Sequence, residues 1–307
     1  MHPALRLPLI LVLTFSWAAA GFASPDDDTP RPANLRLASV AAAVGPLGAD
    51  SVTYAKHAGE VLSIASITKL MTAMVVLDSG RPLDEWVTVV ERDEKAPNNA
   101  YSRIRIGSQL KRGDLIRIAL MSSENRAAYV LSRDYPGGRE AFVDAMNAKA
   151  RSLGMNDTRF VDSSGLSPEN RSTASDLLKM VRAAFGYERI REYSTTAYFR
   201  ARFRKPRYSL SYGNTNPLVK GSRWDVNLSK TGYLREAGRC LVMVTRIDGE
   251  DMAMVLLDSF GTRTPLGDAG RVKRWMTTGD GGRVAGAALR YERKRTEALQ
   301  QALTASN

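Results

Sequence analysis

Cysteine and histidine are almost absent from this chain of 307 residues, which contains one cysteine, Cys240, and two histidines, His2 and His57. One cysteine cannot form an internal disulfide, and so few nitrogen and sulfur ligands cannot build a zinc site. We also find no acidic loop spaced to hold a hard cation, and therefore expect no metal and no other cofactor. Cys240 lies in an apolar, strand-like run, which favours a buried structural thiol over a nucleophile. No Gly-x-Ser-x-Gly elbow accompanies His57, so a Ser-His-Asp triad is not expected.

Long apolar runs are also scarce, and the clearest one lies near the N-terminus, from Leu7 to Ala20, after the positive charge of Arg6. It is too short for a comfortable transmembrane helix, which needs roughly 20 apolar residues. Small residues follow the run, so the pattern predicts a secretory signal peptide over residues 1–23 and a flexible lead-in over residues 24–34. The alternative is that the run stays uncleaved as an N-terminal anchor. A lipid anchor is not expected, because no cysteine follows the run to carry the lipid.

Acidic residues are outnumbered, with 32 Asp and Glu against 44 Lys and Arg, and the formal net charge is +12. A strongly basic protein is suited to polyanionic surroundings. For an exported protein, the anionic cell wall is a better candidate than nucleic acid. The alternative is a generally basic surface without a specific partner, and composition does not choose between the two.

The rest of the chain alternates between strand-like and helical patterns. Strands are predicted near both ends and helices dominate the middle, so both ends should contribute to one sheet in a domain over residues 35–280. Residues 281–307 are expected to form a basic tail or helix. The predicted strands are Leu35–Val44, Ser51–Lys56, Trp86–Glu91, Val226–Lys230, Cys240–Ile247 and Met252–Ser259, and the predicted helices are Ile67–Leu77, Gly113–Met121, Asn125–Tyr135, Glu140–Leu153, Ser175–Phe185 and Gly267–Thr278.

A serine and a lysine lie three residues apart, as Ser66 and Lys69, where the most apolar helical run begins. Side chains at i and i+3 are neighbours on a helix, so the hydroxyl and the amine can meet. A serine needs a base to become a nucleophile, and burial or a nearby cation such as Lys230 can lower the pKa of a lysine enough to serve. The competing interpretation is a helix-capping Ser66 with an exposed Lys69. Ser108 and Lys111 repeat the spacing, but in a polar stretch.

A second motif, Ser123-Glu124-Asn125, comes directly after a predicted helix. Ser123 could relay a proton to a leaving amine, and Asn125 offers both a donor and an acceptor to a substrate amide. Serine and asparagine are also common turn residues, so simple loop polarity is the alternative.

A third motif, Lys230-Thr231-Gly232, lies on a predicted edge strand. The ammonium and the hydroxyl suit a substrate carboxylate, and the glycine permits close approach of another backbone. The backbone N–H groups of Tyr233 and Ser66 could together form an oxyanion hole. An exposed turn is the alternative.

These motifs and the residues around them resemble the low-molecular-mass penicillin-binding proteins of the D-alanyl-D-alanine carboxypeptidase/endopeptidase family. The resemblance runs from about Leu35 to Trp275, with the motifs in the family's order. The segments that carry it are Ala65–Ala73, Ala119–Ala128, Ser172–Leu177, Asn214–Asn216 and Ser229–Tyr233.

The resemblance implies an α/β protein of the α+β kind with the penicilloyl-serine-transferase, or β-lactamase-like, fold: a five-stranded antiparallel sheet flanked by helices, with a helical subdomain. It implies D-Ala-D-X bonds of peptidoglycan peptides as substrate, β-lactam antibiotics as acylating inhibitors, and a periplasmic location. No nucleic acid partner and at most a peripheral association with the membrane are expected. By this resemblance, the catalytic residues are Ser66 as nucleophile, Lys69 as general base and Ser123, and the substrate-binding residues are Asn125, Lys230, Thr231, Gly232 and Tyr233.

Two features favour an endopeptidase that cuts cross-links. The middle motif is Ser-Glu-Asn, whereas carboxypeptidases of the family usually have Ser-Gly-Asn, and only about thirty residues follow Trp275, too few for the C-terminal β-domain that they often carry. A D,D-carboxypeptidase is the runner-up. A β-lactamase is disfavoured because no recognised motif places a glutamate to activate a deacylating water. A non-catalytic cell-wall binding protein is the remaining alternative, and it would not need an activated nucleophile.

Overall fold

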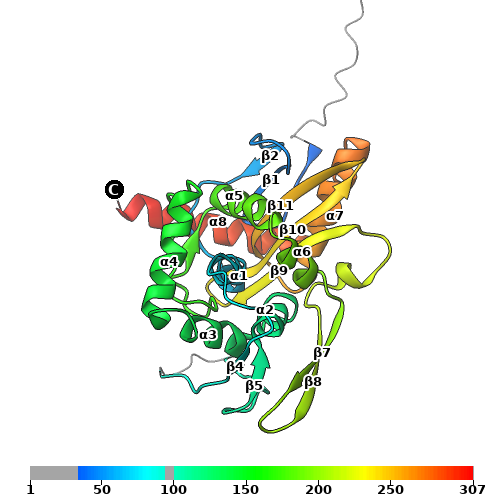
Figure 1. Cartoon of the computed structure of the whole chain (residues 1–307). Helices are drawn as coiled ribbons and strands as arrows, with labels where there is room; N and C mark the ends of the chain where they lie inside the picture. Colours follow the sequence, from blue (N-terminus) through cyan, green and yellow to red (C-terminus); the bar gives the residue numbers. More distant parts are fainter. Residues whose placement is uncertain (1–33, 94–99, 307) are drawn as a thin grey trace, which may run out of the picture.

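A five-stranded antiparallel sheet joins the two ends of the chain, as the sequence predicts (Figure 1). The structure, a computed structural model, describes residues 34–93 and 100–306, so the predicted signal peptide and nearly all of the lead-in lie outside the described residues. The strand order is β2-β1-β11-β10-β9, which leaves β9 at an edge. The strands are β1 Ala41–Pro46, β2 Tyr54–Lys56, β9 Val226–Leu234, β10 Gly238–Ile247 and β11 Glu250–Ser259.

Helices and three small two-stranded sheets make up the rest of the described residues. The small sheets pair β3 Leu62–Ser63 with β6 Arg171–Ser172, β4 Trp86–Thr88 with β5 Gln109–Lys111, and β7 Tyr198–Phe203 with β8 Tyr208–Gly213. The helices are α1 Thr68–Asp78, α2 Arg112–Met121, α3 Asn125–Arg133, α4 Gly138–Ser152, α5 Ala174–Phe185, α6 Glu188–Ser194, α7 Thr264–Thr278 and α8 Gly286–Ser306, with short 3-10 helices η2 Ala65–Ile67 and η3 Pro217–Lys220.

Successive residues of the central strands enter two different cores, because helices cover both faces of the sheet. On β10, Val242 and Val244 pack into the core shared with α1 to α5. Leu241 and Met243 point the other way, into a second core that contains the fully buried Trp275 of α7. The sheet is therefore a buried middle layer, and its edge strand β9 faces the helical subdomain.

The helix α1 forms the centre of the helical subdomain. Every residue from Thr68 to Val76 is buried, and the helix contacts α2, α3, α4, α5 and α6. The predicted burial of this helix is therefore confirmed. Because the short helix η2 precedes α1 and packs against β9, the chain just before α1 lies where the helical subdomain meets the sheet.

Some elements differ from the sequence prediction. Neither the hairpin β7–β8 nor the helix α6 was predicted. In the hairpin, the arginines that alternate along β7 hide its weak apolar pattern, in which only Ala201 and Phe203 are buried. The strand β4 ends at Thr88 instead of Glu91. Among the described helices, none is both long and apolar enough to cross a membrane.

The C-terminal residues form the helix α8, which docks on the last strand of the sheet. Two of its side chains hold the buried Asp258 of β11: the hydroxyl of Tyr291 donates to Oδ1 at 2.6 Å, and Arg295 Nε donates to Oδ2 at 2.6 Å. The helix therefore belongs to the folded body at least as far as Arg295.

The segment before β1 is tied to α7 by the fully buried carboxylate of Asp268. It accepts hydrogen bonds from the backbone N–H of Ala38 and Ser39, at 3.1 and 2.7 Å, and from Ser39 Oγ at 2.7 Å, and it pairs with Arg271 at 2.9 Å. This one side chain therefore holds the start of the sheet in place.

Asp268→Ala should lower the free energy of unfolding by about 3–5 kcal/mol, because it leaves buried donors and a cation without their acceptor. Thermal and urea unfolding measure the change. Asp280→Ala removes an exposed carboxylate just beyond the same helix and serves as the control. A loss below about 1 kcal/mol for Asp268→Ala would mean that this tie is dispensable.

Candidate active site

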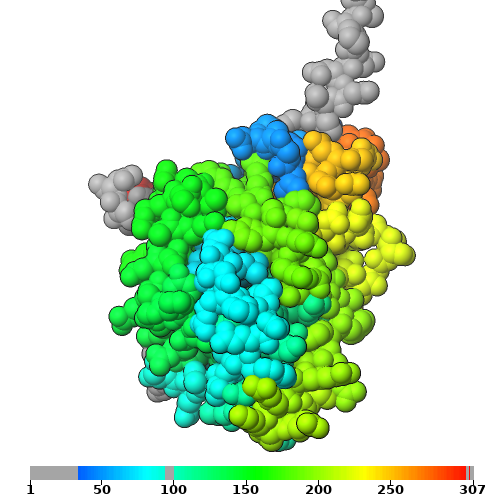
Figure 2. All heavy atoms as spheres, in the orientation of Figure 1, coloured from blue at the N-terminus to red at the C-terminus, as the bar shows by residue number. Residues whose placement is uncertain are grey.

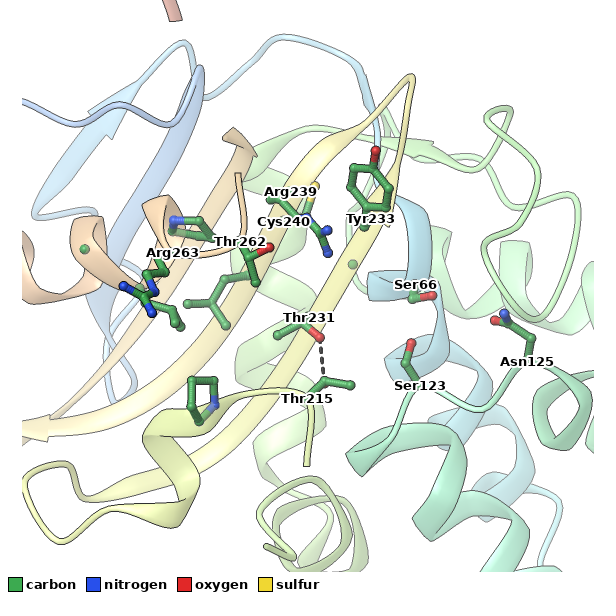
Figure 3. Close-up of a pocket in the computed structure, with 16 residues that line it drawn as sticks. Ser66, Ser123, Asn125, Thr215, Thr231, Tyr233, Arg239, Cys240, Thr262 and Arg263 are labelled. Carbon is green, nitrogen blue, oxygen red and sulfur yellow. Dashed lines mark hydrogen bonds between the residues drawn. The ribbon is translucent and has the colours of Figure 1, made fainter. Parts of the chain in front are cut away.

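A cavity of about 860 Å³ lies between the helical subdomain and the edge strand β9. Figure 3 shows Ser66, Ser123 and Asn125 on one wall, facing Thr231 and Tyr233 on the other. Gly232 also lines the cavity, so six predicted site residues share it. The two predicted lysines are buried behind its serines. The structure thus brings together all eight site residues that were predicted from the sequence.

Ser66 lies in η2, one turn before the regular hydrogen bonding of α1 begins. The preceding residue, Ala65, has a positive φ of 46°, which gives the chain a sharp turn into the helix. The N-cap of α1 is Ile67, and no side chain caps the helix. The alternative in which Ser66 is a cap and Lys69 is exposed is therefore wrong.

The amine of Lys69 has three polar neighbours. Its Nζ lies 2.8 Å from Ser66 Oγ, 2.7 Å from Asn125 Oδ1 and 2.5 Å from the carbonyl oxygen of Ser164. A neutral amine has two N–H donors and one lone pair. The two carbonyl-type oxygens can accept both donors, which leaves the lone pair directed at the hydroxyl of Ser66. This geometry suits a base poised to take the serine proton.

Burial is the main reason that the pKa of Lys69 falls to about 7. The carboxylates of Asp162 and Glu124 oppose this shift and raise the pKa, whereas the cation of Arg92 lowers it further. Arg92 is a nearby cation that the sequence did not identify. The expected interaction with Lys230 is present as well, because the charge of Lys69 lowers the pKa of Lys230 and this repulsion is mutual. A pKa near neutrality leaves much of the amine unprotonated at pH 7.

A loop after α4 supplies the carbonyl oxygen that Lys69 binds, and one buried carboxylate organises this loop. Asp162 Oδ1 accepts the N–H groups of Ser164 and Gly165 at 2.6 and 2.7 Å, and Oδ2 accepts the N–H of Ser167 at 2.8 Å. Although burial raises the pKa of Asp162, these hydrogen bonds outweigh it and hold the pKa below its usual range. Asp162 thereby aims the Ser164 carbonyl at Lys69.

Two glycines allow the backbone around Ser66 to be approached from both sides. Gly165 has φ of +76°, and a Cβ there would lie 2.0 Å from the carbonyl oxygen of Ala65. On the sheet side, a Cβ at Gly232 would lie 3.1 Å from the backbone nitrogen of Ser66. The strand β9 therefore passes close to Ser66, and the N–H groups of Ser66 and Tyr233 are our candidate oxyanion hole.

The second lysine of the site contacts the second serine. Lys230 Nζ donates to Ser123 Oγ at 3.0 Å and to the carbonyl oxygen of Thr231 at 2.7 Å. Ser123 lies in the turn between α2 and α3, with a positive φ of 58°. Burial, and then the charge of Lys69, lower the pKa of Lys230 well below its usual range. A carboxylate that enters the cavity would favour the charged form of Lys230 again.

The glutamate of the Ser-Glu-Asn motif has a structural place. Glu124 is the N-cap of α3, and its Oε2 accepts the N–H of Ala127 at 2.6 Å. Asn125 follows as the first residue of the helix, so its amide is held by a regular element next to Lys69. The cap explains why a glutamate is accommodated at this position.

Several residues at the site were missed from the sequence. Thr215 lines the cavity, and its Oγ1 lies 2.7 Å from Thr231 Oγ1 (Figure 3). Thr215 belongs to Asn214–Asn216, one of the segments that resemble the family, so the sequence contained a signal that could have identified it. Asp162, Ser164 and Arg92 belong to no motif, and only the fold brings them to Lys69.

Of the other candidates considered from the sequence, Ser108, Lys111 and His57 do not line this cavity, whereas Cys240 of β10 lines another part of it. Ser108 and Lys111 repeat the serine–lysine spacing, but Ser108 is buried and Lys111 is exposed. The amine of Lys111 lies 5.9 Å from the ring centroid of Trp86. His57 is exposed in the turn after β2. Cys240 is a buried free thiol, as predicted, and burial raises its pKa to about 12.

The fold and the serine–lysine geometry define an acyl-transferring serine enzyme of the penicillin-binding type. The family model described as D-alanyl-D-alanine carboxypeptidase matches residues 30–261. The chain therefore belongs to this family of serine peptidases, the low-molecular-mass penicillin-binding proteins.

Similar proteins agree with this assignment. A D-alanyl-D-alanine endopeptidase of Pseudomonas aeruginosa is 45% identical over 285 residues, which cover 93% of this chain and 92% of the relative. The crystal structure of the Streptomyces K15 DD-transpeptidase matches with a TM-score of 0.74 at 27% identity, over 79% of this chain and 98% of that one. Penicillin-binding protein D2 of Listeria monocytogenes, in its cefotaxime-bound form, matches with a TM-score of 0.68 at 27% identity, over 80% and 99%.

The rate of acylation by a fluorescent penicillin should rise about tenfold per pH unit below pH 7 and level off above it, because the base must lose its proton first. Stopped-flow labelling between pH 5 and 9 measures this profile. Arg92→Gln removes a cation that lowers the pKa of Lys69, so its midpoint should move to higher pH. A flat profile across this range would rule out Lys69 as the titrating base.

Asp162→Asn should slow acylation roughly 10- to 100-fold, because an amide cannot accept all the N–H groups that fix the Ser164 carbonyl. Its pH midpoint should also move to lower pH, since the lost charge is one that raises the pKa of Lys69. A purely structural defect would not produce this second change. Asp144→Asn, on the exposed face of α4, is the matched control. An unchanged rate and midpoint in Asp162→Asn would refute the positioning role.

Proposed function

We propose that this protein is a D-alanyl-D-alanine endopeptidase that cuts peptide cross-links of peptidoglycan through an acyl-Ser66 intermediate. The observation that carries the proposal is the buried Lys69 amine, 2.8 Å from Ser66 Oγ and held by two carbonyl-type oxygens. No purely binding function requires an amine with a pKa near neutrality beside a serine.

In the proposed acylation, Ser66 Oγ attacks the carbonyl carbon of the penultimate D-Ala and its proton passes to Lys69 Nζ. The tetrahedral oxyanion lies at the N–H groups of Ser66 and Tyr233. As the C–N bond breaks, the leaving amine takes a proton relayed through Ser123, whose hydroxyl lies beside Lys230. The products of this step are the acyl-serine and the free amine, and water later hydrolyses the ester.

The carboxylate next to the scissile bond is proposed to bind at the opposite wall. Thr231 Oγ1 and Thr215 Oγ1 are hydrogen-bonded there, and both side chains line the cavity. The buried Lys230 lies directly behind them on β9 and supplies the balancing positive charge when a carboxylate is present. The same residues would recognise a terminal D-Ala or the D-centre of a direct cross-link, which is why a carboxypeptidase is the runner-up.

Two observations favour the endopeptidase. The relative from Pseudomonas aeruginosa, similar over nearly the whole of both chains, bears that name. In addition, the cavity continues past Thr231 to Arg239 and Arg263, where a leaving group larger than one amino acid would meet cations. Such cations suit the carboxylates of a second peptide strand.

We also propose that β-lactams acylate Ser66 and that the protein works in the periplasm. The similar Listeria structure is a cefotaxime-bound form, and a β-lactam presents a carbonyl and a carboxylate to the same two walls. The predicted signal peptide supports export.

Purified cross-linked muropeptide dimers and pentapeptide monomers, digested side by side, test the proposal. We expect dimers to be converted to monomers faster than monomers lose their terminal D-Ala. Ser66→Ala should abolish both reactions and penicillin labelling, by at least about 1,000-fold, and Lys69→Ala should block acylation too. Labelling that survives in Ser66→Ala would eliminate the nucleophile. Loss of only the terminal D-Ala would favour the carboxypeptidase.

A further inference from the structure

A second hollow, of about 590 Å³, is lined by the β7–β8 hairpin, which projects from the body of the molecule (Figure 1). Arg200 and Arg202 of β7 and Arg204 just after it are exposed, whereas Ala201 and Phe203 between them are buried. Side chains alternate along a strand, so the three arginines share one face and repeat about every 7 Å. We call these three residues the arginine face. Figure 2 shows the hairpin at the lower edge of the molecule, open to solvent.

Local contacts hold two of these arginines in position. Arg200 Nε donates to Ser209 Oγ at 2.9 Å, and Arg204 Nε donates to Gln109 Oε1 at 2.8 Å. The guanidinium of Arg204 also stacks 4.2 Å from the ring centroid of Trp86. Side chains that are already ordered lose less entropy when a ligand binds. The arginine face is therefore better prepared for binding than a set of free surface lysines.

The charge of the arginine face has no acidic counterpart nearby. From Tyr193 to Trp224 the chain contains seven Lys and Arg and no Asp or Glu. Some arginines elsewhere in the molecule pair with carboxylates, as the buried Arg112 does with Glu85. Across residues 34–93 and 100–306, no ion pair involves any arginine of the face. The unbalanced charge indicates an anionic ligand from outside the molecule.

The hairpin leads directly out of the candidate active site. Its base is closed by the hydrogen bond from Asn214 N to the carbonyl oxygen of Ala197, and the next residue, Thr215, lines the catalytic cavity. The six residues of β8 span about 20 Å, so the arginine face extends outward from the cleft by about that length.

We propose that the arginine face binds carboxylates of the peptide stems along a peptidoglycan strand and thereby holds the polymer beside the cleft. The identity of this polymer rests on the proposed function. Guanidinium groups pair with carboxylates in a two-pronged geometry, and a row of cations suits a polymer that repeats its acidic groups. An anionic membrane fits less well as the ligand. Proteins that bind such membranes insert apolar side chains into them, whereas Phe203 of the hairpin is buried and Leu210 is half-buried.

Co-sedimentation with purified peptidoglycan sacculi at graded salt concentrations tests the proposal, in a Ser66→Ala background that prevents digestion. Replacing Arg200, Arg202 and Arg204 together with Gln should weaken binding about tenfold and reduce its salt dependence. The protein with all three arginines intact should no longer bind sacculi whose carboxyl groups have been amidated. With Ser66 intact, the triple variant should react with fluorescent penicillin at the normal rate, because the face lies outside the cleft.

A matched variant separates the local effect from net charge. Replacing Arg290, Arg293 and Lys294 of α8 with Gln removes the same number of positive charges from another exposed surface. It should bind sacculi almost normally. If the triple hairpin variant does not fold, Arg202→Gln is tested alone, since this side chain is exposed and forms no hydrogen bond with another described residue. Its binding of sacculi should weaken about threefold.

Three results would overturn the proposal: equal losses in the hairpin and α8 variants, no loss in either, or arginine-dependent binding to anionic phospholipid vesicles with none to sacculi. Failure of the proposed function has a different signature. An enzyme that never cleaves muropeptide dimers, but binds sacculi through these arginines, would refute the endopeptidase and leave the binding face standing.

Discussion

The chemistry of this protein depends on keeping one amine dry and correctly oriented. Lys69 lies on a helix that is buried on all sides, and its two acceptors, Asn125 and the Ser164 carbonyl, come from separate parts of the chain. Burial disfavours the ammonium, while the acceptors direct the lone pair of the neutral amine toward Ser66. If either acceptor moved, the amine would stay buried but would no longer point at its serine. The helical subdomain therefore serves mainly to build this small arrangement.

Ser66, the proposed nucleophile, is held where two layers of the fold meet. Gly165 approaches the backbone of Ser66 from the helical side, and Gly232 approaches it from the edge of the sheet. Neither position tolerates a larger residue without displacing η2. The cleft thus lies where the helical subdomain meets the sheet, with the proposed base Lys69 on one side and Thr231, the proposed carboxylate-binding residue, on the other.

Two buried lysines lie at one small site, and the charge of Lys69 lowers the pKa of Lys230. Lys69 has a pKa near neutrality, and burial and the charge of Lys69 hold the pKa of Lys230 well below its usual range. Two ammonium groups in one desolvated cleft would repel each other. In the proposed mechanism, a carboxylate at Thr231 would change this balance, because it would stabilise charge on Lys230 and leave Lys69 as the base. The substrate would thereby help to set the protonation state in which it reacts.

The sequence by itself determined the sheet built from both ends, the buried helix α1 and the three motifs, because periodicity and short spacing record local geometry. It did not reveal the roles of Asp162, Ser164 or Arg92, nor the hairpin β7–β8. Asp162 and Ser164 reach Lys69 only after the loop that follows α4 has packed beside it, and Arg92 reaches it from the segment after β4. No local sequence pattern encodes such contacts. The sequence could propose Lys230 as a cation near Lys69, but only packing added Arg92 to it, since electrostatic influence depends on distance and burial in three dimensions.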